Sequence, residues 1–157
     1  MRELGYISFV RSLLEYSGGI WDSTVREECD SLEMVQRRAA RWARGARGII
    51  SVTALLNDLQ WQTLSDRRND QRLSLFYKIL NNSIDIPPET VDLRISKTKT
   101  RKKHNLVLQR EKGRDKHSPY WKGTICRTIP SWNDLDRCVA EAGSYDIFKS
   151  QLAPTAP

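Results

Sequence analysis

The chain has 157 residues, enough for one domain or for one small domain with an appendage. Hydrophobic residues make up 39% and charged residues 29%, which is a polar globular composition rather than a disordered one. No apolar run approaches the roughly 18 residues that a transmembrane helix needs. Three widely spaced cysteines argue against a disulfide framework, so we expect an intracellular protein in the nucleus or the cytoplasm.

Apolar residues at helical spacing predict a first helix over about 4–16, which Gly18 and Gly19 end. A second helix follows, opened by a capping box in which Thr24 and Glu27 satisfy each other's backbone donors. This helix runs to about residue 44 and ends at Gly45 to Gly48. Its buried face is expected to consist of Cys29, Leu32, Val35, Ala39 and Trp42.

Two more helices are predicted before residue 84. Ser51 can cap a short helix, and Thr63 or Ser65 can cap a longer one with Asp66 in its first turn. Asn81-Asn82 and then Pro87-Pro88 end the longer helix. The tryptophans at apolar positions are expected to lie in the core; they are Trp21, Trp42, Trp61 and Trp132.

The rest of the chain changes composition twice. Segment 84–119 is basic and reads as an irregular linker, with a short strand at 106–108. Segment 120–152 reads as a small packed unit, with one helix starting near Pro130-Ser131 and another capped by Ser144, before a frayed tail at 153–157. The predicted fold is therefore mainly α: a helical domain over 1–83, a basic linker and a small C-terminal helical unit.

Essentially all of the net charge of +7 lies in one stretch. Segment 94–116 holds ten basic and two acidic residues, which indicates a polyanionic partner. We expect it to follow a nucleic-acid backbone through Lys97, Lys99, Arg101, Lys102 and Lys103. A flexible soluble linker and a nuclear import signal at 99–103 are the alternatives.

A second cationic site is predicted on the helix that ends near residue 44. Five arginines occur within eleven residues that contain no acid: Arg37, Arg38, Arg41, Arg44 and Arg47. On a helix, Arg37, Arg41 and Arg44 share a face, with Arg38 beside it. Guanidinium groups suit phosphate geometry, so this face is a candidate contact for a template–primer duplex. The alternative is a solvated face paired with acids elsewhere.

Other aromatic, histidine and cysteine residues do not form a recognisable binding or catalytic pattern. Tyr120 and Trp121 could stack on bases, but core packing is the simpler interpretation. His104, His117, Cys126 and Cys138 match no standard zinc spacing, so no metal or other cofactor is expected. No phosphate-binding loop, dinucleotide fingerprint or nucleophile elbow occurs in the sequence, so we expect no enzymatic activity.

Four stretches, taken together, resemble one family. They are segments 6–16 with 20–22, 32–42, 59–79, and 127–135 with 148–152, the last including Ile129-Pro130-Ser131-Trp132-Asn133. In this order they resemble the region after the polymerase palm in Jockey-like and related non-LTR (LINE-type) retrotransposon reverse transcriptases. The resemblance implies a thumb-like helical domain, and it places the family's catalytic aspartates upstream of residue 1.

The resemblance implies a non-catalytic fragment of an RNA-directed DNA polymerase polyprotein. Its expected partners are RNA or an RNA–DNA duplex, bound with little sequence preference, and the upstream palm, but no membrane. Two other readings remain. One is a protein-interaction module or retrotransposon relic without a nucleic-acid role, and the other is a nuclease or polymerase. The arginine helix and basic segment favour nucleic-acid binding over the interaction module. The absence of carboxylate and histidine constellations from the sequence argues against the enzyme.

Overall fold

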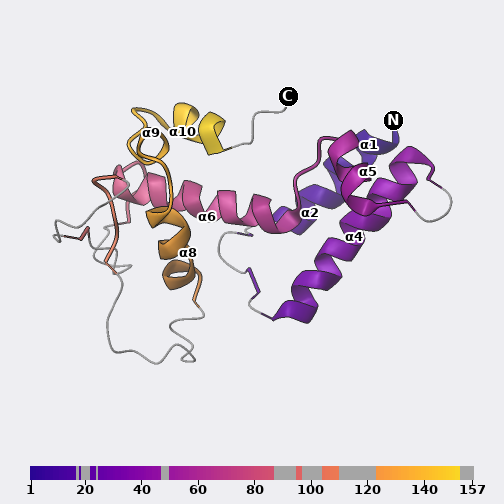
Figure 1. Ribbon diagram of the computed structural model, residues 1–157, viewed down its shortest axis with the longest axis horizontal. Coiled ribbons are helices and arrows are strands. Elements are labelled where there is room, and N and C mark those ends of the chain that lie inside the picture. The colour runs from indigo at the N-terminus through magenta and orange to yellow at the C-terminus, as the bar shows by residue number, and fades with distance from the viewer. Residues whose placement is uncertain are drawn as a thin grey trace. The chain divides into compact units, whose positions relative to one another are not determined.

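The computed structural model describes residues 1–16, 18, 22–23, 25–46, 50–86, 95–96, 104–109 and 123–152 (Figure 1). It is mainly helical, which confirms the predicted fold class. The chain divides into two compact units, Met1–Asn69 and Asp70–Pro157, which we describe separately. Within the described ranges, no helix is long and apolar enough to cross a bilayer.

The first unit begins with a run of helix: α1 (Arg2–Gly5), the π-helical η1 (Tyr6–Arg11) and α2 (Ser12–Glu15). After it come α4 (Arg26–Arg44) and α5 (Val52–Asp58). The core of this unit is built from Tyr6, Ala40, Leu55, Leu56, Leu59 and Trp61. The rings of Tyr6 and Trp61 stack at 4.6 Å between centroids, so the expectation that Trp61 lies in the core is confirmed.

Two predicted helix ends are confirmed in this unit. The Ser51 side chain accepts a hydrogen bond from the Ala54 N–H and caps α5. Gly45 ends α4 in the left-handed conformation, at φ 62°, which glycine adopts without strain. At the other end, α4 has Val25 at its N-cap, so it begins one residue later than a cap at Thr24 predicts.

Helix α6 (Leu64–Leu80) starts in the first unit and ends in the second. Thr63 caps it by accepting from the Asp66 N–H at 3.1 Å, and the Thr63 hydroxyl donates to the Asp66 carboxylate at 2.7 Å. The sequence allowed Thr63 or Ser65 here, and the structure selects Thr63. Asn82 takes a left-handed φ of 52° just after the helix, as expected for a stop at Asn81-Asn82.

The second unit contains α8 (Thr124–Asn133), α9 (Arg137–Ala140) and α10 (Tyr145–Leu152). Its core contains Leu73, Phe76, Tyr77, Ile79, Leu108, Ile129, Trp132 and Phe148. Ser144 accepts from the Ile147 N–H and caps α10, as predicted. Helix α8 begins at Thr124, however, and Pro130 lies inside it. Burial of Cys126 and Ile129 extends the apolar face upstream and offsets the hydrogen bond that Pro130 cannot make.

Part of the expected linker belongs to this core. Leu108 is buried and pairs with Ile95 in an isolated antiparallel bridge, the only β-pairing among the described residues. Helix α8 holds segment 104–109 through side chains: the Trp132 indole N–H donates to the Leu106 carbonyl at 2.9 Å, and Asn133 bonds both backbone groups of Leu108. The division of the chain thus differs from the expected boundary at residue 83 and linker over 84–119.

Candidate nucleic-acid interface

The side of helix α4 that packs against the core of the first unit carries small and polar residues. Gln36 and Ala40 are buried, whereas Val35 is 37% exposed and Trp42 is 55% exposed. The prediction that Val35 and Trp42 lie on the buried face is therefore wrong. Alanine lets the helix approach Tyr6 and Trp61 closely, and this closer packing takes the place of burying the larger side chains.

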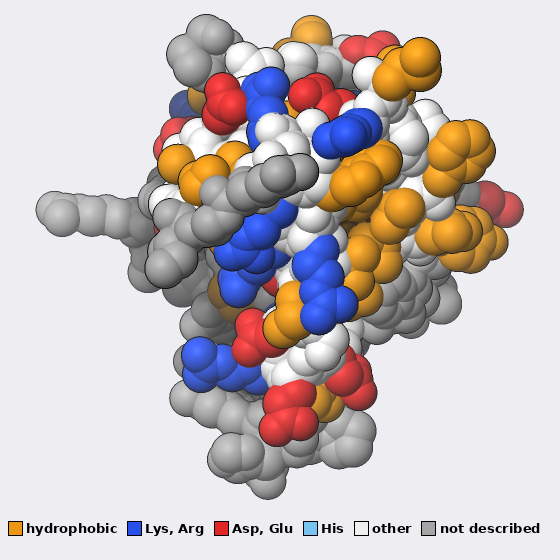
Figure 2. Space-filling model, turned by 90° about the vertical axis from the view of Figure 1, so that its right-hand side faces the viewer, with side chains coloured by type: hydrophobic (Ala, Val, Ile, Leu, Met, Phe, Trp, Pro, Cys, Tyr) orange, Lys and Arg blue, Asp and Glu red, His pale blue; other side chains and the backbone are white. Residues whose placement is uncertain are grey.

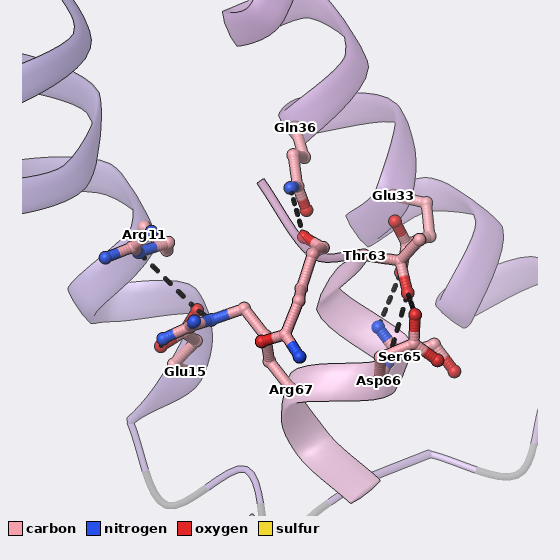
Figure 3. A network of polar contacts seen from close by, with 9 residues as sticks. Arg11, Glu15, Glu33, Gln36, Thr63, Ser65, Asp66 and Arg67 are labelled. Carbon is pink, nitrogen blue, oxygen red and sulfur yellow. Dashed lines mark hydrogen bonds and ion pairs between the residues drawn. The ribbon is translucent and has the colours of Figure 1, made fainter. Parts of the chain in front are cut away.

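Polar contacts fix the rotation of α4 about its own axis (Figure 3). The Gln36 amide donates to the Gln62 carbonyl at 2.7 Å, and the Glu33 carboxylate accepts from the Ser65 N–H at 2.7 Å. Both partners lie where the chain enters α6, so α4 supplies a carboxylate to the positive N-terminal end of that helix. As a result, the opposite side of α4 is turned to solvent.

A second polar cluster ties the N-terminal helices to α6 (Figure 3). Glu15 forms a two-point ion pair with Arg67, whose Nη2 donates to Oε2 at 2.9 Å, and Arg11 lies 3.6 Å from the same carboxylate. Burial lowers the pKa of Arg11, with the positive charge of Arg67 adding to the effect. These arginines are used within the unit, as is Arg68, whose buried guanidinium pairs with Asp22 at 2.7 Å.

Three of the predicted phosphate-binding arginines lie on the solvent side of α4. Arg37, Arg38 and Arg41 are all exposed, and none has an acidic partner among the residues that the structure describes. Among the described residues, Arg38 donates a hydrogen bond to the Met34 sulfur at 3.6 Å. Since α4 is helical throughout this stretch, the predicted common face exists.

Arg44 behaves differently from these three residues. Its Nε lies 2.7 Å from the Asp58 carboxylate, its Nη2 donates to the Asp58 carbonyl at 2.9 Å, and its Nη1 lies 3.6 Å from Glu3. It therefore joins the end of α4 to α5 and α1. Arg44 therefore matches the alternative expectation from the sequence, in which an arginine of this helix pairs with acids from other parts of the chain.

Trp42 stands beside the exposed arginines instead of in the core. The Arg2 guanidinium lies over its ring, 5.7 Å from the centroid, and Arg2 Nη1 donates to the Trp42 carbonyl at 3.2 Å. Figure 2 looks onto the side of the molecule that carries α1, α4 and α5, where Lys and Arg side chains lie next to exposed hydrophobic ones. No sequence pattern indicates this placement, because a tryptophan at helical spacing is typical of a core.

The remaining candidates are placed as follows. His104 is buried, with Nε2 3.0 Å from the Trp132 carbonyl, Cys126 is buried and Cys138 is exposed. Among the described residues, no group of three metal-ligating side chains comes together. Several predicted residues lie outside the described ones: Arg47, Lys97, Lys99, Arg101, Lys102, Lys103, His117, Tyr120, Trp121, and Trp21 of the expected core.

Compared with protein-family models, curated proteins and solved structures, the chain matches none of them. The resemblance to LINE-type reverse transcriptases therefore stays a prediction from the sequence. The structural features that bear on function are the free arginine face of α4 and the exposed indole next to it.

Proposed function

We propose that the chain binds the phosphate backbone of RNA or an RNA–DNA duplex through the solvent face of α4, as a non-catalytic accessory region of a LINE-type reverse transcriptase. The observation that carries this proposal is the exposure of Arg37, Arg38 and Arg41 without acidic partners in the described part of the chain. The sequence resemblance supports the assignment to a LINE-type reverse transcriptase. The exposed arginines of α4 support binding through phosphates.

The chemistry of the face suits a polyanion. Elsewhere in the first unit, Arg11, Arg44, Arg67 and Arg68 all pair with carboxylates, so these four arginines are used within the unit. An arginine without such a partner can exchange water and counterions for a phosphate at no cost in broken ion pairs. Because phosphate contacts carry no base information, little sequence preference is expected.

A protein-interaction role is the second candidate. The N-terminal helical run exposes a set of large apolar residues, which are Leu4, Phe9, Leu13 and Tyr16. Exposed apolar patches on a small protein mark contact surfaces, and the upstream palm would be one such partner. This surface belongs to the N-terminal run, whereas the cationic face belongs to α4, so both roles can be tested separately.

The test measures how binding depends on salt. Fluorescence anisotropy would follow the full chain binding a labelled RNA–DNA duplex at several salt concentrations. Each phosphate contact contributes about 0.9 to the slope of log affinity against log salt on a duplex. Replacing Arg37 and Arg41 with alanine should therefore reduce the slope by about two.

The matched control removes the same charge elsewhere. Arg137 and Lys149 lie at exposed positions of α9 and α10. The R137A/K149A variant should keep the wild-type slope, although its net charge equals that of R37A/R41A. Equal slopes for all three proteins would show that Arg37 and Arg41 make no phosphate contact.

A further inference from the structure

Trp42 is the feature of α4 that phosphate binding leaves unexplained. It is 55% exposed, whereas Trp61 and Trp132 are buried in the cores of their units. It lies one helical turn after Arg38, so these two side chains share a side of the helix, and Arg41 in turn neighbours Arg38 at a spacing of three residues. An exposed indole on the same helix as two arginines without acidic partners in the described part of the chain suits a ligand with both an aromatic face and negative charge.

The indole is held in position from within the protein. Arg2 lies over the ring, and its hydrogen bond to the Trp42 carbonyl ties the guanidinium to the end of α4. A ring already fixed by a cation loses less conformational entropy on binding than a freely rotating side chain.

We infer that Trp42 makes the α4 face a site for single-stranded nucleic acid, in which an unpaired base stacks on the indole face away from Arg2 while Arg38 and Arg41 contact the flanking phosphates. This inference rests on the proposed function and narrows its substrate class. Within a duplex the base faces are covered by neighbouring base pairs, so only a single-stranded segment offers one to the indole. Stacking accepts any base, and the site is therefore tolerant of sequence.

Charge is the reason to prefer nucleic acid over an apolar protein surface at Trp42. A protein partner that covered the indole would also strip water from Arg38 and Arg41, which is costly for unpaired charges. A nucleotide supplies a phosphate for the arginines together with an aromatic base for the ring. Grooves that bind single strands combine these two elements.

The test distinguishes the contribution of the bases to binding from that of the phosphates. The full chain is titrated with a labelled single-stranded RNA and with a sugar–phosphate strand of equal length that lacks bases. Wild-type protein should bind the strand with bases about five- to a hundredfold more tightly, the range that one stacked base gives. Trp42→Ala should lose most of this difference without changing the salt slope, and Trp42→Phe should keep part of it.

Phe9→Ala is the control, because Phe9 is 75% exposed but lies on the N-terminal helical run, and it should leave both affinities unchanged. Equal binding of wild type to the two strands would overturn the inference even if Trp42→Ala failed to fold. If the salt slope falls in R37A/R41A but wild type binds the two strands equally, the stacking inference is rejected and the phosphate proposal stands. An unchanged slope in R37A/R41A would reject the phosphate proposal as well.

Discussion

Replacing Asn133 with alanine should release segment 104–109 from α8. The Leu108 N–H donates to the Asn133 Oδ1 at 2.7 Å, and the Asn133 Nδ2 donates to the Leu108 carbonyl at 2.9 Å. Leu108 is only 2% exposed, so water does not readily replace either bond. A buried polar group that loses its partner costs about 1–3 kcal/mol. For two groups, with some water entering the space left by the side chain, we expect a loss of about 2–4 kcal/mol.

Hydrogen exchange at the Leu108 amide measures this loss directly. Since 1.4 kcal/mol corresponds to a factor of ten, exchange should become roughly thirty- to several-hundredfold faster in Asn133→Ala. Asn57→Ala, at an exposed position of α5, is the control and should leave Leu108 protection unchanged. Unchanged protection in Asn133→Ala would mean that the core contacts of Leu108 hold the segment without the amide.

The Asn133→Asp variant adds a pH signature to the same prediction. The introduced carboxylate can still accept from the Leu108 N–H, but its second oxygen would face the Leu108 carbonyl and repel it. Protonation converts that oxygen into a donor, so folding raises the pKa of the introduced group. The variant's stability deficit should therefore be full above the raised pKa of the folded state, shrink as pH falls through that pKa, and level off below the ordinary aspartate pKa of about 3.9. A deficit that does not vary with pH would contradict the geometry.

Two further outcomes are expected for the first unit. Burial raises the pKa of Tyr6 from 10.0 to about 12, so Tyr6 contributes stability that is complete below pH 10 and is lost as pH rises toward 12. Thermal melts of Tyr6→Phe should lack this alkaline loss, and an identical pH profile in both proteins would refute the assignment. Asp22→Asn should cost about 3–5 kcal/mol in urea unfolding, because it leaves the Arg68 guanidinium buried without its counter-charge. Replacing Asp22 and Arg68 together with leucine and methionine should recover most of that loss, and a double variant no more stable than Asp22→Asn would contradict this.

The positions of most helices could be predicted because their signals are local. Caps at Ser51, Thr63 and Ser144 and the glycine stop at Gly45 depend on residues within one turn of the helix end. The largest departure was α8, where burial of a face that includes Ile129 moved the start upstream of Pro130. Tertiary packing sets the start of α8, and no local sequence pattern predicts it.

The candidate site shows the same limit. The sequence predicted the arginine face of α4, but not which arginine is used internally, since the partners of Arg44 come from α1 and α5. It also assigned Trp42 to the core, because hydrophobicity alone does not reveal that alanines pack closer to Tyr6. No sequence pattern predicted a role for Gln36 or Glu33, although their hydrogen bonds to the start of α6 set the rotation of α4.

The continuity of α6 bears on how the chain folds. The first turn of a helix is its slow and unfavourable step, with a nucleation constant of about 10⁻³. In α6 this step can begin at either end, at the cap formed by Thr63 and Glu33 or at the apolar cluster around Leu73 and Phe76. Whichever core condenses first gives the other a helix already nucleated, so only elongation remains. A chain cut between Asn69 and Asp70 would have to nucleate both halves, and each core would fold more slowly than it does in the intact protein.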